Sequence, residues 1–153
     1  MNDMIDFQVT GANNMEALAG QVAKYARQLA VIYLIGELGA GKTTWARGFL
    51  KALGHLGAVK SPTYTFIEPY VLQGRHIYHF DLYRLATHDA LESLGFREYF
   101  ANENLCLIEW PERAWQLLPH PDLTIKITGM QDERNVNISA DSDLGATVLA
   151  ELV

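Results

Sequence analysis

Val31-Ile32-Tyr33-Leu34-Ile35 runs directly into Gly36-Glu37-Leu38-Gly39-Ala40-Gly41-Lys42-Thr43, and this junction carries the clearest structural signal in the chain. The five apolar residues end at a glycine, which predicts a short central strand buried on both faces. From Lys42 to about Leu53 the apolar residues recur with a helical period, and Gly54 is placed to end the helix. A strand, a glycine-rich turn and an amphipathic helix in direct succession predict an α/β fold.

The turn has the form Gly-x-x-x-x-Gly-Lys-Thr, the Walker A phosphate-binding sequence, in the strand-to-helix context that this sequence requires. Glycines are needed because the loop turns its backbone N–H groups inward around phosphate oxygens. We expect Lys42 to bridge the β- and γ-phosphates of ATP and to act in catalysis, and the Thr43 hydroxyl to coordinate Mg²⁺. The alternative is a glycine-rich turn with a chance lysine. The other expected nucleotide contacts in this segment are Gly36, Glu37, Leu38, Gly39, Ala40, Gly41 and Thr44.

Two carboxylates follow apolar runs and are candidates for the second magnesium ligand. Glu109 comes directly after Leu105–Ile108, which predicts a buried strand, whereas Asp81 follows the less uniformly apolar Ile77–Phe80. We therefore assign the metal-binding role to Glu109 and expect Asp81 to position or deprotonate the attacking water, or to support the metal indirectly. Asp81 as an ordinary helix-capping acid, and Glu109 as a residue at the rim of the core, are the alternatives.

Three further features have a functional and a structural interpretation. Ser61-Pro62-Thr63-Tyr64-Thr65 is either a segment that senses the γ-phosphate, with Thr63 or Thr65 near the metal, or a Ser-Pro turn leading into a strand. Trp110 is either a core aromatic or a lid over the nucleotide, and we favour core packing. His76 and His79 are three residues apart on an expected strand and so face opposite ways, which argues against a shared metal.

The remaining segments predict a mixed sheet. Asn13-Asn14-Met15-Glu16 resembles a capping box at the start of a helix that continues to about Leu29. Two pairs of strand-like runs flank short polar turns, as hairpins do. These pairs are 66–72 with 76–80 and 123–127 with 136–139, and short helices are expected at 88–94 and 143–152. The expected fold is a three-layer α/β sandwich of the P-loop NTPase type around a mixed parallel and antiparallel sheet.

Composition and charge narrow the class of protein. The 153 residues are 49% hydrophobic and 20% charged, which suits a single domain spanning 1–153. A net charge of −6 argues against direct, sequence-independent nucleic-acid binding. Cys106 has no second cysteine to pair with, and Met1–Val9 lacks the features of a signal peptide. With its most apolar stretch, Leu29–Ile35, far below the roughly 20 residues of a membrane span, we expect a cytoplasmic protein with no membrane association.

Four segments in this order resemble the TsaE (YjeE) family. They are Gly36–Thr44, Val59-Lys60-Ser61-Pro62-Thr63-Tyr64-Thr65, Tyr78-His79-Phe80-Asp81-Leu82-Tyr83-Arg84 and Leu107-Ile108-Glu109-Trp110-Pro111. Together they are far more specific than the Walker sequence alone. The family consists of bacterial ATPases needed to make threonylcarbamoyladenosine in tRNA.

The resemblance implies partners and contacts that the spacing of residues does not give. It implies ATP hydrolysis in support of a transferase complex of TsaD and TsaB, with tRNA reached only through that complex. It assigns phosphate binding to Lys42, Mg²⁺ to Thr43 and Glu109, catalysis to Asp81, and a switch-like loop to Thr65. Adenine contacts are expected from Gly11–Asn13, with Ala12 central, and from Arg134, although Met15 stands where the family often has threonine.

Three other functions use similar parts. A small-molecule or nucleoside kinase shares the loop but usually carries an arginine-rich lid. A GTPase usually reads guanine with Asn-Lys-x-Asp, which this chain lacks. A nucleotide-responsive binding module would hydrolyse ATP slowly until a partner completes the site.

Overall fold

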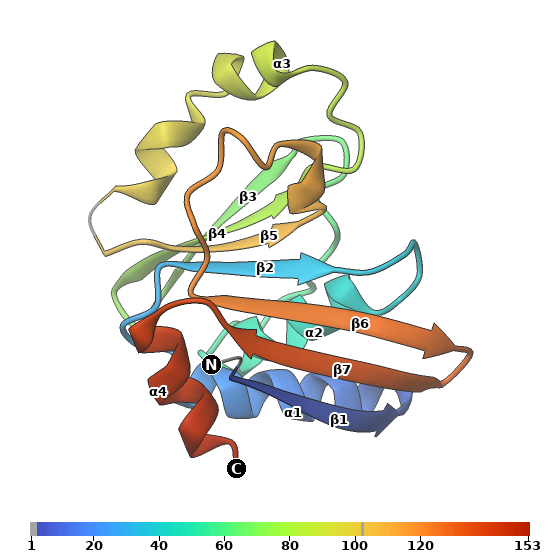
Figure 1. Ribbon diagram of the computed structural model, residues 1–153. Helices are drawn as coiled ribbons and strands as arrows, with labels where there is room; N and C mark the ends of the chain where they lie inside the picture. Colours follow the sequence, from blue (N-terminus) through green and yellow to red (C-terminus); the bar gives the residue numbers. More distant parts are fainter. Residues whose placement is uncertain (1–2, 102) are drawn as a thin grey trace.

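The computed structural model describes residues 3–101 and 103–153, and seven strands in this part of the chain form one sheet in the order β1-β7-β6-β2-β5-β4-β3 (Figure 1). The strands are β1 (Met4–Thr10), β2 (Val31–Ile35), β3 (Ile67–Leu72), β4 (Arg75–Asp81), β5 (Leu105–Glu109), β6 (Leu123–Met130) and β7 (Glu133–Ala140). The helices are α1 (Gly11–Tyr25), α2 (Lys42–Ala52), α3 (His88–Ser93) and α4 (Asp143–Glu151), with 3₁₀ turns η1 (Phe96–Phe100) and η2 (Pro111–Arg113).

The sheet is mixed, as the sequence predicts. β2 lies at its centre and pairs in parallel with β5 on one side and β6 on the other, and β4 pairs in parallel with β5. The two predicted hairpins, β3–β4 and β6–β7, add antiparallel pairs toward the edges, and β1 pairs antiparallel with β7. The parallel strands all end at one edge of the sheet, which is where ligands bind in open α/β sheets.

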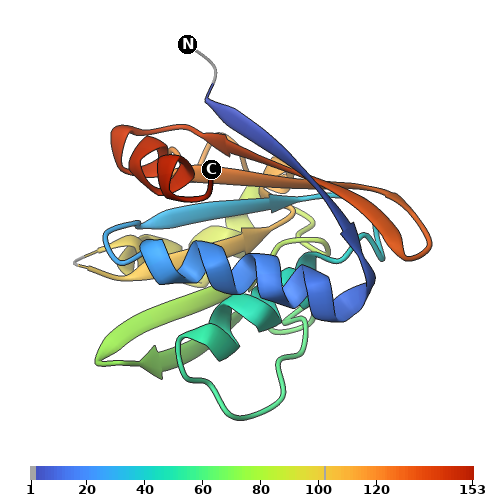
Figure 2. The same cartoon turned by 90° about the horizontal axis from the view of Figure 1, so that it is seen from below.

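Helices cover both faces of the sheet, so the fold has the three predicted layers (Figures 1 and 2). α1 and α2 lie side by side on one face, where Trp45, Phe49 and the inward side chains of β2, β5 and β6 form a core to which Val148 and Leu149 of α4 also belong. On the other face, Leu91, Phe96 and Ala114 from the α3, η1 and η2 region pack against Phe80 and Ile108. Because both faces are covered, β5 is buried along its whole length.

The amino-terminal segment differs from the sequence prediction in two ways. Residues 4–10 form β1, a strand that the sequence analysis does not identify. α1 begins at Gly11 directly after this strand, and its N-cap Thr10 makes no side-chain cap bond, so the predicted capping box at Asn13 is wrong. The chain turns straight from β1 into α1, and the Gly11 amide donates instead to the Asp132 carbonyl of the β6–β7 turn at 2.9 Å.

The other elements follow the prediction to within a few residues. β2, β5 and the start of α2 coincide with the predicted strands and helix, and Gly54 follows α2 with a left-handed φ of 108°. β6 and β7 are longer than predicted, because they continue to a two-residue turn at Gln131-Asp132. None of the helices in the described part of the chain is both long enough and apolar enough to cross a membrane.

Candidate functional site

The glycine-rich loop leaves the end of β2 and enters α2 in a conformation that depends on glycine. Gly41 precedes the helix with a φ of 116°, a left-handed value that side chains disfavour. A Cβ on Gly36 would lie 2.7 Å from the carbonyl oxygen of Ile127, so the first glycine is required by the close approach of β6. The loop therefore leads to the first turn of α2, where backbone N–H groups lack helical partners and the helix dipole is positive.

Lys42 is folded back over this loop. Its side chain is buried, and the ammonium group donates to the carbonyl oxygens of Gly36 and, at 2.9 Å, of Glu37. The Trp110 ring lies against the ammonium, with 4.5 Å between Nζ and the ring centroid. Trp110 also contacts the Tyr83 ring, so its indole packs against neighbouring side chains and at the same time forms part of the site.

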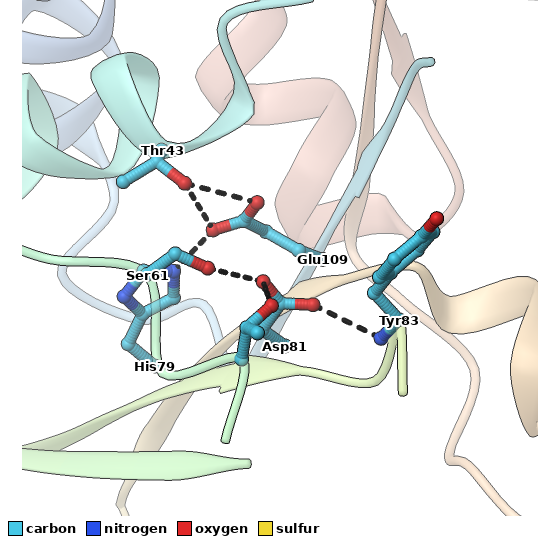
Figure 3. Close-up of polar contacts among 7 residues, drawn as sticks. Thr43, Ser61, His79, Asp81, Tyr83 and Glu109 are labelled. Carbon is cyan, nitrogen blue, oxygen red and sulfur yellow. Dashed lines mark hydrogen bonds and ion pairs between the residues drawn. The ribbon is translucent and has the colours of Figure 1, made fainter. Parts of the chain in front are cut away.

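The two candidate carboxylates lie side by side at the ends of neighbouring strands. Asp81 and Glu109 are partners in the parallel β4–β5 register, and both are almost completely buried. The Thr43 hydroxyl lies 3.0 Å from Oε2 and 3.2 Å from Oε1 of Glu109 (Figure 3). Because β5 and not β4 lies next to β2 in the sheet, Glu109 is the carboxylate that contacts the first turn of α2.

Asp81 is held by a different set of donors. The Ser61 and Thr63 hydroxyls both donate to Oδ2, the latter at 2.9 Å, and the Tyr83 amide donates to Oδ1 at 3.0 Å (Figure 3). The segment between α2 and β3 therefore reaches the site through Asp81. Residues 82–85 after Asp81 form a turn and not a helix, so the predicted alternative of a helix-capping acid has no helix to cap.

Buried polar and charged side chains gather at this one place. In the described residues they are Lys42, His79, Asp81 and Glu109. Burial lowers the pKa of Lys42, and the nearby carboxylates of Glu109 and Asp81 oppose that shift. Because charged groups are rarely buried without a functional or pairing reason, the cluster makes the carboxyl end of β4 and β5 the candidate functional site.

A cavity of about 460 Å³ opens between the loop and these strands. From the loop and α2 its lining comprises Leu38, Gly39, Gly41, Lys42, Thr43 and Thr44. The opposite wall includes Thr63, Asp81, Glu109 and Trp110. A cleft of this size that is lined by charged and hydroxyl side chains beside a helix N-terminus suits an anionic ligand with a triphosphate.

Several residues predicted to contact the nucleotide do not line this cavity. Gly36, Glu37 and Ala40 are not part of its lining, and the carbonyls of Gly36 and Glu37 instead hold the Lys42 ammonium. Thr65 is exposed, and Thr63 is the threonine of that segment that reaches Asp81.

The two predicted adenine-contacting positions lie behind the loop. Arg134 donates to the carbonyl of Ala40 at 3.0 Å and to that of Gly39 at 3.4 Å. Ala12 is exposed in the first turn of α1, whose Met15 packs near Gly41. Arg134 therefore contacts the loop backbone, and neither Ala12 nor Arg134 lines the cavity.

The donor set is compatible with magnesium bound together with a phosphate. Within residues 3–101 and 103–153 no three His, Cys, Asp or Glu side chains group closely enough to hold a metal ion by themselves. Mg²⁺ at phosphate sites usually takes one or two protein oxygens and completes its shell with phosphate and water. Thr43 and Glu109, whose oxygens already touch, provide such a pair.

His79 is the site residue that sequence reasoning missed. The two histidines do face opposite ways, with His76 exposed and His79 fully buried. His79 contacts Glu109, however, with 2.6 Å between Nε2 and Oε2. The contact joins residues 30 positions apart through the β4–β5 pairing, so local sequence gives no signal for it beyond a histidine inside a strand that ends at the site.

Comparison with known proteins agrees with the motifs. The family model described as threonylcarbamoyl adenosine biosynthesis protein TsaE matches residues 9–136. A relative from Haemophilus influenzae, named tRNA threonylcarbamoyladenosine biosynthesis protein TsaE, is 46% identical over 82% of this chain and 80% of its own length. A Bacillus subtilis protein of the same name is 36% identical over 89% of this chain and 85% of its own.

The fold has a solved counterpart as well. The crystal structure of Bacillus subtilis YdiB superposes with a TM-score of 0.84 at 31% identity and covers 99% of this chain and 95% of that one. The strand order, the glycine-rich loop and the four sequence segments therefore lead to one conclusion. The chain belongs to the TsaE family of tRNA threonylcarbamoyladenosine biosynthesis proteins.

Proposed function

We propose that this protein binds Mg·ATP in the cavity beside α2 and hydrolyses it in support of threonylcarbamoyladenosine formation in tRNA. The observation that carries the proposal is the contact of the Thr43 hydroxyl with the Glu109 carboxylate, directly beside the buried Lys42 ammonium. A hydroxyl, a carboxylate and an ammonium at the start of a helix are the groups that a magnesium-bound triphosphate needs.

Each group has a distinct part in binding. The loop and first-turn amides of α2 would receive phosphate oxygens. Lys42 would exchange its two carbonyl acceptors, Gly36 and Glu37, for phosphate oxygens, which are stronger acceptors because they are charged. Thr43 and Glu109 would hold the Mg²⁺, which when bound neutralises charge on the phosphate oxygens.

Asp81 is the group available for the attacking water. Its carboxylate lies one strand away from Glu109 and lines the cavity, where it can orient a water or accept a proton from it. In the present arrangement its oxygens accept from Ser61, Thr63 and the Tyr83 amide. Any movement of the 61–65 segment would therefore change how much of this carboxylate is free to act.

The same segment is where we propose that TsaB and TsaD act. Tyr64 lines the cavity but is 78% exposed, and it neighbours Thr63, which donates to Asp81. A partner that contacts Tyr64 would thus act on the donors of the catalytic carboxylate. We expect slow ATP turnover by the isolated protein, faster turnover with TsaB and TsaD, and access to tRNA only through that complex, since the net charge is −6.

The test is ATP turnover by the isolated protein, then with purified TsaB and TsaD, then with tRNA. Lys42→Ala should lower ATP affinity by about 100-fold, because charge-assisted bonds to phosphate are lost. Glu109→Gln should remove the Mg²⁺ dependence, and Asp81→Asn should slow turnover more than binding. Lys51→Ala is the matched control, because Lys51 lies on the same helix in a surface ion pair with Glu16.

Three results would count against the proposal. Unchanged ATP affinity in Lys42→Ala would remove the loop as the binding site. Phosphoryl transfer to an added small molecule or nucleoside in excess of phosphate release would indicate a kinase. Tighter binding of GTP than of ATP would assign a different nucleotide.

A further inference from the structure

The fully buried His79 makes a contact that the proposed reaction does not by itself require. His79 lies on β4 two residues before Asp81, and strand alternation puts both side chains on the α2 face of the sheet. Its Nε2 lies 2.6 Å from Oε2 of Glu109. In the view of Figure 3 Thr43 lies above the Glu109 carboxylate and the imidazole ring of His79 lies below it.

The hydrogen bonds around His79 assign its proton to Nε2. In the described residues Nδ1 is buried and has no hydrogen-bond partner. A tautomer with its proton on Nδ1 would leave that N–H unpaired and would set the Nε2 lone pair against a carboxylate oxygen. A proton on Nε2 gives Glu109 a donor and leaves only an acceptor without a partner, which is the more tolerable arrangement.

This donor restricts the orientation of the Glu109 carboxylate. Oε2 accepts from His79 on one side and from Thr43 on the other, and Oε1 lies 3.2 Å from the same threonine hydroxyl. With Oε2 fixed, the carboxylate plane cannot rotate freely about its last bond. Oε1 is then held facing the helix start, where Thr43 would share a metal ion with it.

The neighbouring carboxylate does not use His79. Asp81 takes its donors from Ser61, Thr63 and the Tyr83 amide. The two acids therefore have separate supports: Asp81 is held largely by the segment after α2, whereas Glu109 is held from within the sheet. Loss of His79 should affect the metal ligand and leave the donors of Asp81 in place.

We propose that His79 is a positioning residue that orients Glu109 for magnesium, an inference that rests on the proposed Mg·ATP site. The measured quantity is the Mg²⁺ concentration at half-maximal binding of a fluorescent ATP analogue. His79→Leu should raise this concentration by about tenfold or more, as loss of a hydrogen-bond partner of a metal ligand does. Affinity for the analogue in EDTA should change less than twofold, because the loop and Lys42 are untouched.

Two amide variants separate positioning from core packing. In His79→Gln the amide nitrogen of the new side chain can reach the position of Nε2. In His79→Asn the side chain is too short, and its amide nitrogen corresponds to Nδ1. We expect His79→Gln to restore the wild-type Mg²⁺ midpoint and His79→Asn to resemble His79→Leu. In a Glu109→Gln background, where binding should no longer depend on Mg²⁺, His79→Leu should change the affinity for the analogue less than twofold, since the group that it positions is already altered.

The control and the outcomes keep this inference apart from the proposed function. His76→Gln, an exposed position on the same strand, should leave the midpoint unchanged. If the wild-type protein shows no Mg²⁺-dependent nucleotide binding, the proposed function fails. If the wild type binds but His79→Gln and His79→Asn share its midpoint, the positioning role is overturned while the proposed function stands. If His79→Leu does not fold, the comparison of His79→Gln with His79→Asn still tests the positioning role.

Discussion

The carboxyl and amino ends of the parallel strands use their charged side chains in different ways. At the carboxyl end, Thr43, His79 and Glu109 bond to one another through side chains. At the amino end, charged groups bond mainly to the backbone. Asp122 accepts from the amides of Ala30 at 2.8 Å and Val31 at 3.2 Å, and it also accepts from the Ser142 hydroxyl.

Arg75 extends the same pattern at the amino end. It donates to the carbonyls of Glu103, Ala26 and Leu29 beside a cavity of about 1200 Å³, and burial lowers its pKa. This cavity is larger than the one at the proposed site, but the guanidinium on its wall is committed to three carbonyls in two connecting segments. Turning Arg75 to a ligand would release backbone carbonyls in two segments, whereas around the smaller cavity only Lys42 would have to leave its carbonyls, and Thr43, His79 and Glu109 bond to one another. We therefore propose that the smaller cavity is the functional one.

Asp122→Ala should show most clearly that the amino end of the sheet contributes to the free energy of unfolding and not to Mg·ATP binding. It removes a carboxylate that bonds two backbone amides and one hydroxyl, so we expect the free energy of unfolding to fall by about 3 kcal/mol. The melting temperature should fall by about 9 °C. Urea denaturation measures the first quantity and scanning calorimetry the second. At 25 °C, Mg·ATP affinity should stay within twofold of wild type.

Asp141→Ala is the matched control for that experiment. Asp141 is a neighbouring carboxylate whose side chain accepts, among the residues that the structure describes, only from the Thr124 hydroxyl, at 2.6 Å. Asp141→Ala should lower the free energy of unfolding by about 1 kcal/mol. If Asp122→Ala instead weakened ATP binding with little change in unfolding, the proposed division between the two ends of the sheet would be wrong.

Arg134, like Lys42, lies at the carboxyl end but donates to backbone carbonyls of the loop, in its case those of Gly39 and Ala40. Arg134→Ala should loosen the loop and lower Mg·ATP affinity by about tenfold, the equivalent of one charge-assisted hydrogen bond. The free energy of unfolding should fall by less than about 1 kcal/mol. Titration calorimetry with ATP and with inorganic triphosphate measures the effect.

The two ligands distinguish two roles for Arg134. If it holds the loop, Arg134→Ala weakens ATP and triphosphate equally. If it contacts adenine, as the family resemblance implies, only ATP binding weakens. The ATP affinity of Arg134→Lys should lie between that of Arg134→Ala and that of wild type. A lysine can reach one carbonyl but lacks the planar fork that bonds two.

The parts of the fold that sequence predicts are those fixed by short-range patterns. β2, the loop and α2 follow from an apolar run, glycines at set spacing and a helical period within 24 residues or so. β5 and its terminal Glu109 follow from a five-residue pattern. β1 has no compact apolar run, but Ile5, Phe7 and Val9 alternate with polar residues, which is the period of a half-buried strand. The prediction missed this local signal, and the pairing with β7 makes the strand evident.

The contacts that organise the site depend on distance in space. His79 meets Glu109 only because β4 and β5 pair in one register, and a shift of one residue would turn either side chain to the other face. Likewise Thr63 and not Thr65 reaches Asp81, which depends on the path of the loop before β3. Residue types at the site could be predicted from sequence, but their donors and acceptors could not.

Cys106 lies on β5 between the two ends of the sheet, and its replacement should have the smallest effect on stability and on Mg·ATP binding. Its thiol is buried and donates to the Tyr99 carbonyl at 3.3 Å, and burial raises its pKa to about 12. Cys106→Ala should cost about 1 kcal/mol of unfolding free energy at pH 7 and leave Mg·ATP binding unchanged. Because the thiol of the unfolded chain ionises near the ordinary cysteine pKa of 9.0, wild-type stability should fall as pH rises from there toward 12.

Cys106→Ala has no thiol to ionise, so its stability should not show this fall at high pH. The stability advantage of wild type over Cys106→Ala should therefore shrink above pH 9 and then reverse sign. Urea denaturation between about pH 7 and pH 11 measures the difference. Rapid reaction of the native wild-type thiol with a maleimide at about pH 8 would contradict this account, because it would require an accessible thiolate at a position where neighbouring strands and helices exclude water. A change in Mg·ATP affinity would show that the middle of β5 transmits strain to Glu109, and the two ends of the sheet would then not act independently.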